Sequence, residues 1–198
     1  MKSGRLIMLN GTSSAGKTSI LTELQKKLPQ LYLLAGLDKF LNFLPESYFK
    51  LPQWNEVMGL SNRSGPIGDV LISGMHRSIR ALLDSGNNVL ADQVFINSNW
   101  VAEAASLFSG CEAYLIGIHC PKEFIVQREK DRKNRTLGSS ALQFDVVHQV
   151  TEYDFSIDSS LNSPEKNAEI ILEFLKTEVA PFAFQSLSKK LEFRQPLG

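Results

Sequence analysis

The feature that most constrains this chain is a glycine-rich junction near its start. The apolar run Arg5–Asn10 ends at Gly11, and a Gly-Lys-Thr sequence follows five residues later. Apolar residues then recur at helical spacing over Lys17–Leu28, until Pro29 interrupts the pattern. A short apolar run that stops at a glycine is typical of a buried strand, and the spacing after the loop is typical of a helix. The sequence therefore predicts a strand, a tight loop and a helix in direct succession.

The loop in this junction fits the pattern G-x-x-x-x-G-K-[ST] from Gly11 to Thr18. Its glycines let a phosphate approach the backbone, successive N–H groups converge on the phosphate oxygens, and the following helix directs its positive dipole end at the same anion. We expect Lys17 to be an exposed donor that reaches the β- and γ-phosphates of ATP, and the Thr18 hydroxyl to hold Mg²⁺. A glycine-rich turn without a ligand is the alternative, but the position between a strand and a helix favours a phosphate cradle. The residues predicted to contact the nucleotide are Gly11, Thr12, Ser13, Ser14, Ala15, Gly16, Lys17, Thr18 and Ser19.

Short apolar runs alternate with helical patterns along the rest of the chain. This alternation predicts right-handed crossovers and a parallel sheet covered by helices on both faces, which is a three-layer α/β fold. We expect strands at Arg5–Asn10, Leu31–Ala35, Asn88–Ala91, Glu112–His119 and Phe155–Ile157, and helices at Lys17–Leu28, Asp69–Ser85, Asn97–Phe108, Pro121–Asn134, Ala141–Val150 and from Pro164 to near Ala180.

Composition narrows the classes of protein that fit this pattern. With 198 residues, 43% of them hydrophobic, the chain suits a single domain with a sizeable core over residues 1–198. The 21 basic and 21 acidic residues balance, so no global field attracts nucleic acid. The start of the sequence does not resemble a signal peptide, and no apolar run approaches the roughly 18 residues of a membrane helix. We therefore expect a cytoplasmic protein that binds neither nucleic acid nor a membrane.

Two aspartates follow strand candidates, at the sheet edge where parallel sheets bind their ligands. Asp38 lies just beyond the second candidate, where a carboxylate can accept a proton from an attacking hydroxyl. Asp92 follows the third candidate, and its carboxylate can contact Mg²⁺ through water or bind the acceptor. The simpler interpretations are a helix cap at Asp38 and a turn or cap at Asp92, and the spacing alone leaves these alternatives open.

Three arginines, at positions 128, 132 and 135, are spaced to share one face of a helix. Arg128, Arg132 and Arg135 could close on a triphosphate and stabilise charge in the transition state, or could form an ordinary solvated face. No N-K-x-D signature of guanine-specific proteins occurs, and the chain is too short for most motor modules. These observations favour a kinase among proteins with this loop.

Six segments together resemble one family of enzymes in their order and spacing. They are "LIMLNGTSSAGKTSI", "LAGLDKFLNFLP", "VLADQVF", "IGIHC", "REKDRKNRTLG" and "VVHQVTEYDFSIDSS", and the family is that of the chloramphenicol phosphotransferases, P-loop kinases. The resemblance implies a five-stranded parallel sheet like that of nucleotide and shikimate kinases, and ATP-dependent phosphorylation of a chloramphenicol hydroxyl, which inactivates the antibiotic. It also implies that Lys17 and Thr18 bind ATP and Mg²⁺, that Asp38 is the base, and that Arg135 lies in a lid over approximately residues 127–142.

The sequence departs from the family on the side where the acceptor should bind. Gln93 stands where the family tends to show a second acidic residue, and the insertion over approximately residues 45–68 shares little with the family pattern. The apolar side chains of this insertion could line an acceptor pocket or form a satellite cluster under a loop. They are Tyr48, Phe49, Trp54 and Met58.

We therefore predict a kinase that transfers the γ-phosphoryl group of ATP to a hydroxyl of a small molecule, with a chloramphenicol-like acceptor favoured. The alternatives are a metabolic kinase of the shikimate or gluconate type and a nucleotide-binding regulatory module without activity. The alternating apolar and basic residues after Pro181 could pack on the domain or on a second copy of the chain, so a homo-oligomer stays open.

Overall fold

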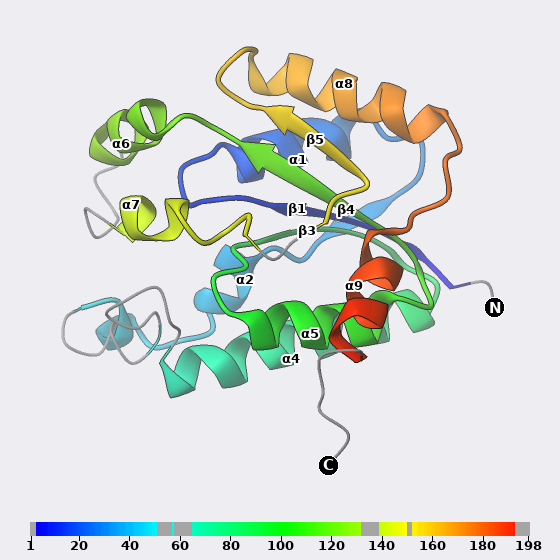
Figure 1. Ribbon diagram of the computed structural model, residues 1–198, viewed down its shortest axis with the longest axis horizontal. Coiled ribbons are helices and arrows are strands. Elements are labelled where there is room, and N and C mark those ends of the chain that lie inside the picture. The colour runs from blue at the N-terminus through cyan, green and yellow to red at the C-terminus, as the bar shows by residue number, and fades with distance from the viewer. Residues whose placement is uncertain (1–2, 51–56, 58–64, 132–138, 150–151, 193–198) are drawn as a thin grey trace.

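The computed structural model describes residues 3–50, 57, 65–131, 139–149 and 152–192, and within them five strands form one parallel sheet (Figure 1). The order of the strands is β2-β3-β1-β4-β5, and every neighbouring pair is parallel. The predicted five-stranded parallel sheet between helices is thereby confirmed. The strands are β1 (Arg5–Asn10), β2 (Tyr32–Leu34), β3 (Asn88–Gln93), β4 (Glu112–His119) and β5 (Phe155–Asp158).

Helices cover both faces of the sheet, with α1 and α8 on one face and α4, α5 and α9 on the other (Figure 1). None of the helices in the described ranges combines the length and the hydropathy needed to cross a membrane. The helices are α1 (Lys17–Lys27), α2 (Leu37–Leu41), the 3₁₀ turn η1 (Glu46–Phe49), α4 (Pro66–Asp84), α5 (Ser98–Phe108), α6 (Lys122–Asp131), α7 (Ser139–Phe144), α8 (Pro164–Lys176) and α9 (Ala183–Glu192).

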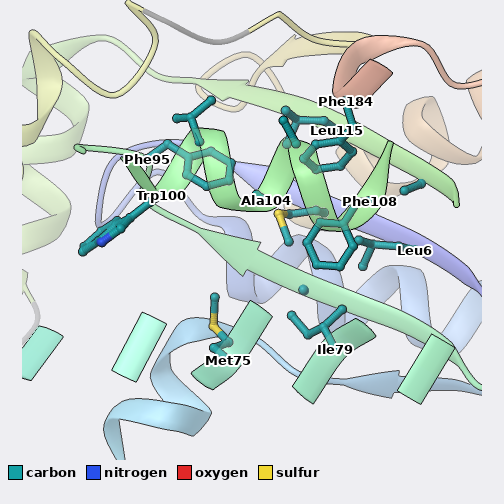
Figure 2. Close-up of a cluster of buried hydrophobic side chains, with 14 of the residues drawn as sticks. Leu6, Met75, Ile79, Phe95, Trp100, Ala104, Phe108, Leu115 and Phe184 are labelled. Atoms are coloured by element: carbon teal, nitrogen blue, oxygen red, sulfur yellow. The ribbon is translucent and has the colours of Figure 1, made fainter. Parts of the chain in front are cut away.

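Strand β1 divides the core into two parts because its side chains alternate between the faces of the sheet. Leu6 and Met8 pack with the cluster under α4, α5 and α9, part of which Figure 2 shows. Ile7 and Leu9 pack with the cluster under α1 and α8. All four side chains are fully buried, which explains why this strand is a continuous apolar run rather than an alternating one.

Several element boundaries differ from those expected from the sequence, most of them by one residue, and three of the larger differences are as follows. Strand β3 continues two residues past Ala91, because both faces of the strand are still covered there, so Asp92 and Gln93 are part of the strand. Helix α4 begins at Pro66 rather than at Asp69, since proline is well suited to the first turn of a helix. Helix α8 ends at Lys176, four residues before the expected end near Ala180.

The segment after the expected helix Pro121–Asn134 also differs. Helix α7 begins at Ser139 and ends at Phe144, where a helix over Ala141–Val150 was expected. Residues 145–149 form turns, and their backbone N–H groups at Val147 and Gln149 donate to carbonyls three or four residues earlier. Arg132 and Arg135 lie outside the described residues, as do Trp54 and Met58.

The C-terminal segment packs on its own domain. Ala183, Phe184 and Leu187 of α9 are buried, and the Phe184 ring meets the Phe108 ring of α5 at a centroid distance of 5.5 Å (Figure 2). The Asp154 carboxylate fixes the start of α9, because its Oδ1 accepts the N–H of Ala183 at 3.0 Å. Its Oδ2 accepts a backbone N–H of β4 at 2.7 Å, so one carboxylate joins α9 to the sheet.

Candidate active site

The glycine-rich loop joins β1 to α1 at the edge where all the strands end (Figure 1). A side chain at Gly11 would place its Cβ 2.4 Å from the carbonyl oxygen of Ile118, so only glycine fits where the loop crosses β4. Gly16 has a φ of 91° and precedes α1, a left-handed conformation that glycine adopts without strain. Ser14 has a φ of 63°, which is unusual for a residue with a side chain. The loop is thus curled so that its backbone approaches whatever lies inside it.

Lys17 is buried rather than exposed, contrary to the expectation from the sequence. Its side chain turns back under the loop, and Nζ donates to the carbonyl oxygens of Gly11 and Thr12, each at 2.8 Å. The loop shields the side chain because its curled backbone supplies both acceptors. The ammonium group therefore lies at the centre of the loop.

Thr18 and Asp92 meet at the base of the loop. The Thr18 hydroxyl donates to Asp92 Oδ2 at 3.3 Å. Burial raises the pKa of Asp92, and the nearby Asp38 carboxylate raises it further, whereas the charge of Lys17 lowers it. A hydroxyl and a carboxylate side by side are oxygen ligands of the kind that Mg²⁺ prefers, so this pair fits the metal predicted here.

Asp92 also holds the helix that carries the candidate base. The N–H of Leu37, at the start of α2, donates to Asp92 Oδ1 at 3.0 Å. The backbone of Gly36 passes so close that an added Cβ would lie 2.0 Å from the same oxygen. Asp38 is half-buried in the first turn of α2 and is not its cap, since Gly36 occupies the N-cap position. One buried carboxylate therefore ties the phosphate loop to Asp38.

A pocket of about 320 Å³ opens beside the loop, between α1, α6 and the start of α8. Arg128 borders it and donates through Nη2 to the carbonyl oxygen of Ser159 at 3.3 Å. Ser159 in turn donates through its hydroxyl to the carbonyl oxygen of Ala15 at 2.7 Å. The lining residues are Ser14, Ala15, Gly16, Ser19, Ile20, Arg128, Asp131, Ser159, Asn162, Pro164 and Asn167.

The polar groups of this pocket fit a nucleotide. Ser14 Oγ is buried and has no hydrogen-bond partner among the described residues, although buried hydroxyls are normally paired. A cation at Arg128 and the start of α1 lie beside it, and both attract phosphate. The pocket is also large enough to hold a small organic group next to the loop.

A second set of contacts lies over the end of β1. Asn10 Nδ2 donates to the Tyr153 hydroxyl at 2.7 Å and to the carbonyl oxygen of Val147 at 2.9 Å. The Tyr153 hydroxyl lies 2.6 Å from His148 Nδ1, and the His148 ring stacks on that of His119 at a centroid distance of 4.1 Å. Burial, with the charges of His119 and Lys17, lowers the pKa of His148 to about 4, so this ring is neutral at pH 7.

Gln93 is buried at the end of β3 and lies in a chain of polar side chains. Its Nε2 donates to His76 Nε2 at 3.0 Å, while Oε1 accepts the N–H of the next residue at 2.8 Å. The other ring nitrogen of His76 then carries the proton and donates to Glu103 Oε2 at 3.2 Å. Burial lowers the pKa of His76 despite this carboxylate. Gln93, at which the sequence departs from the family pattern, is thus hydrogen-bonded to a neutral histidine.

Large apolar side chains are exposed on the side of α2 and η1. The Phe43 side chain is 73% exposed and meets the Phe40 ring edge to face at 5.2 Å. Phe49 and Val70, on η1 and α4, are also exposed, and Tyr48 is half-buried. Sequence reasoning pointed to Tyr48 and Phe49 but missed Phe43, which looked like an ordinary helical residue.

Sequence reasoning also missed the contacts that hold the loop from outside. Gln143 of α7 accepts the N–H of Ser13, and Ser159 donates to the loop carbonyl of Ala15. The partners in each pair are separated by more than 100 residues; Gln143 lies outside the family-like segments, and the segment that contains Ser159 does not indicate this contact. Only the fold brings them together.

Comparison with known proteins agrees with this geometry. The sequence model of the family described as "Chloramphenicol phosphotransferase-like protein" matches residues 4–176. "Putative O-phosphotransferase Rv2636" of Mycobacterium tuberculosis is 33% identical over an alignment of 203 residues, gaps included. The alignment covers 96% of this chain and 90% of that protein.

Two crystal structures share the fold at low sequence identity. The APS kinase CysC of Mycobacterium tuberculosis, in complex with AMPPNP and APS, has a TM-score of 0.64 at 13% identity, over 89% of this chain and 99% of that chain. A sugar kinase from Janibacter sp. HTCC2649 has a TM-score of 0.63 at 18% identity, over 88% of this chain and 96% of that chain.

The fold and the loop are like those of P-loop kinases. Within that class, the chain belongs to the chloramphenicol phosphotransferase-like family, which makes it an O-phosphotransferase, a kinase that acts on a hydroxyl group.

Proposed function

We propose that this chain transfers the γ-phosphoryl group of ATP to a hydroxyl of a neutral small molecule with an apolar body, of which chloramphenicol is the first to test. The observation that carries the proposal is the bridge through Asp92. Its two carboxylate oxygens contact Thr18 of the phosphate loop and Leu37 of the helix that carries Asp38. The bridge supports a site in which the phosphate donor and the candidate base are held by one buried group.

The residues of the site divide the reaction between them. Lys17, the loop amides and Arg128 neutralise the charge of the triphosphate, and Thr18 and Asp92 would hold Mg²⁺, which would supply further positive charge to the phosphates. The Asp38 carboxylate accepts the proton of the attacking hydroxyl. The bond from that hydroxyl oxygen to phosphorus forms while the bond from phosphorus to the leaving oxygen breaks, and ADP departs.

Lid arginines remain part of the proposal. Arg132 and Arg135 follow Arg128 at helical spacing, and cations so placed would stabilise the charge of the transferring group. Arg128 supports this role, because its guanidinium already lies beside Gly16, 3.6 Å from the position of an added Cβ.

The acceptor side favours a neutral, apolar molecule. Phe43 and Phe49 are exposed there and offer aromatic surface. Residues 46–68 contain only Lys50 and Arg63 as cations, whereas an anionic acceptor is normally held by paired arginines in bidentate contacts. Phosphorylation of chloramphenicol by this chain would then inactivate the antibiotic, as the resemblance to the chloramphenicol phosphotransferases implies.

A panel of acceptors tests the proposal by measuring ADP release. The panel contains chloramphenicol, shikimate, gluconate and a nucleoside monophosphate, each with ATP and Mg²⁺, and a reaction without an acceptor gives the background. We expect the highest kcat/KM for chloramphenicol or a similar neutral alcohol. A clearly higher kcat/KM for an anionic acceptor would overturn the acceptor assignment. Tight ATP binding with no stimulation by any alcohol would instead indicate a binding module.

A further inference from the structure

Gln143 of α7 bonds to an amide that the phosphate loop should offer to its ligand. Its Oε1 accepts the N–H of Ser13, the third residue of the motif, at 2.9 Å. The Gln143 side chain is 5% exposed, so this hydrogen bond is shielded from water. A side-chain amide oxygen thus occupies a position where the motif directs N–H groups at phosphate oxygens.

The segment around Gln143 is fixed by two further contacts, so its approach to the loop is not accidental. The N–H of Ser140 donates to Glu129 Oε1 of α6 at 3.1 Å, and Glu129 is buried. The carbonyl oxygen of Val147 accepts from Asn10 at the end of β1, and the Val147 side chain lies in the core. Helix α7 is thereby attached to the loop, to α6 and to the sheet.

One N–H group has a single hydrogen, and it cannot donate linear bonds to two acceptors at once. A phosphate oxygen near Ser13 therefore competes with Gln143 Oε1 for this donor. The phosphate is the stronger acceptor, because hydrogen bonds to an ionised group are shorter and stronger than those between neutral groups. Lys17 supports the phosphate as well, since its ammonium lies within the same loop.

We propose that Gln143 competes with the nucleotide phosphates for the Ser13 N–H of the loop. When phosphate binds there, Gln143 is released, and this change is transmitted to α7 and, through Ser140 and Glu129, to α6. This inference rests on the proposed function, because it requires the loop to bind a nucleotide. It assigns to Gln143 a regulatory role: the side chain weakens nucleotide binding and couples it to the position of the helices that border the lid.

The test compares four proteins by calorimetric titration with ATP and Mg²⁺: the wild type, Gln143→Ala, Gln143→Glu and Gln149→Ala. Removal of the competing amide should lower the Kd of Gln143→Ala about three- to tenfold, the effect of one net hydrogen bond. Gln143→Glu places a carboxylate at the Ser13 N–H, where it is a stronger acceptor than the amide and repels phosphate, so it should raise the Kd about tenfold or more. Gln149 is an exposed glutamine on the same segment, and its loss should leave the Kd unchanged.

The expected changes in Kd have opposite signs in Gln143→Ala and Gln143→Glu, and this distinguishes competition from a merely structural role. If Gln143 only stabilised the loop, Ala and Glu would both weaken ATP binding, and that result would overturn the inference while leaving the proposed function standing. No ATP binding by the wild type would overturn both. Thermal denaturation confirms that each variant is folded. If Gln143→Ala is not, Gln143→Asn replaces it, because its amide is one methylene too short to reach Ser13 and should tighten ATP binding in the same way.

Discussion

The two halves of the proposed site, which meet at Asp92, would recognise their ligands by different means. On the nucleotide side, the groups proposed to bind the phosphates are the backbone amides and Lys17 of the loop Gly11–Thr18, with Arg128 of α6 beside them. On the proposed acceptor side, the side chains come from separate elements: Phe43 follows α2, Phe49 lies in η1, and Gln93 of β3 bonds to His76 of α4.

This difference explains why the nucleotide side can be recognised in the sequence, whereas the acceptor cannot. A phosphate is the same in every nucleotide, so a loop of backbone amides can serve many enzymes and keeps a recognisable pattern. An acceptor is held by side chains, and these change with the acceptor while the fold stays the same. The nucleotide side therefore indicates the reaction, whereas the acceptor side must be tested compound by compound. Substitutions on each side, and at Gly36 beside Asp92, can test this division.

The largest effect should come from Lys17→Met on the nucleotide side. Methionine keeps an apolar stem but removes the ammonium that stabilises the transferring phosphoryl group, so turnover should fall about 10³-fold or more. The Gly11 and Thr12 carbonyls also lose their donor, which should lower the free energy of unfolding by about 1–3 kcal/mol. ADP release and urea denaturation measure the two effects separately. Turnover within tenfold of the wild type would exclude the assigned role.

Asp38→Asn on the acceptor side should have the next largest effect. The amide cannot accept the proton of the acceptor hydroxyl, so kcat should fall about 10²- to 10⁴-fold while ATP binding is kept. Asp84→Asn is the matched control. Asp84 is an exposed aspartate at the C-terminal end of α4, and within the described contacts it pairs only with Arg80. If both variants keep kcat within a factor of a few, Asp38 serves only to stabilise α2.

Much of this architecture could be predicted because periodicity reports local burial. The sheet and its layers were predicted from the apolar run at β1, the helical spacing of α1 and the alternation of strands with helices. The loop motif predicted at which edge of the sheet the phosphate site lies. The end of β3 was harder to place. Asp92 and Gln93 are polar and so look like turn residues, yet both are buried within the strand because their partners come from α2 and α4.

Other features left no local signal in the sequence. The segment of helix α9 was described as alternating apolar and basic residues, which left its packing open, and its contacts with α5 show which side chains are buried. Lys17 was expected to be an exposed donor because it lies at the start of a helix, but two carbonyls of the curled loop bind it. Gln143 reaches Ser13 across 130 residues of sequence, a pairing that no periodicity can indicate.

Gly36→Ala tests the junction between the two halves. An alanine Cβ would lie 2.0 Å from Asp92 Oδ1, so the carboxylate or α2 must move, and overpacking of this kind typically costs about 1–3 kcal/mol of stability. Because Asp92 contacts both Thr18 and Leu37, kcat and ATP affinity should both fall, each by about tenfold, which corresponds to 1.4 kcal/mol.

The matched control is Gly74→Ala in the middle of α4. Nothing lies within 4 Å of the added Cβ there, so this alanine should raise the free energy of unfolding by about 0.5–1 kcal/mol through helix propensity and leave activity unchanged. If Gly36→Ala reduces only kcat, Asp92 supports the acceptor side alone, and the division at this residue is incorrect.

The smallest expected effect is the pH dependence that His76 adds to stability on the acceptor side. Burial lowers the pKa of His76 in the folded protein, so the neutral ring is favoured there, whereas the unfolded chain takes up a proton below about pH 6.5. The stability that the neutral His76 contributes is therefore fully present above pH 6.5 and is lost as the pH falls. One such histidine changes the free energy of unfolding by at most about 1.4 kcal/mol per pH unit.

Urea denaturation at pH 7.5, 6.5 and 5.5 measures this slope in the wild type and in His76→Gln. The wild type should lose stability toward pH 5.5, with part of the slope coming from His119 and His148, whose pKa values are also lowered. The slope of His76→Gln should be smaller, because glutamine can bond to Gln93 and Glu103 without titrating. Its ATP affinity should match the wild type, since His76 contacts only the acceptor half. Equal slopes in the two proteins would mean that His76 is not held neutral by the fold, whereas a change in ATP affinity would show that the two halves are coupled beyond Asp92.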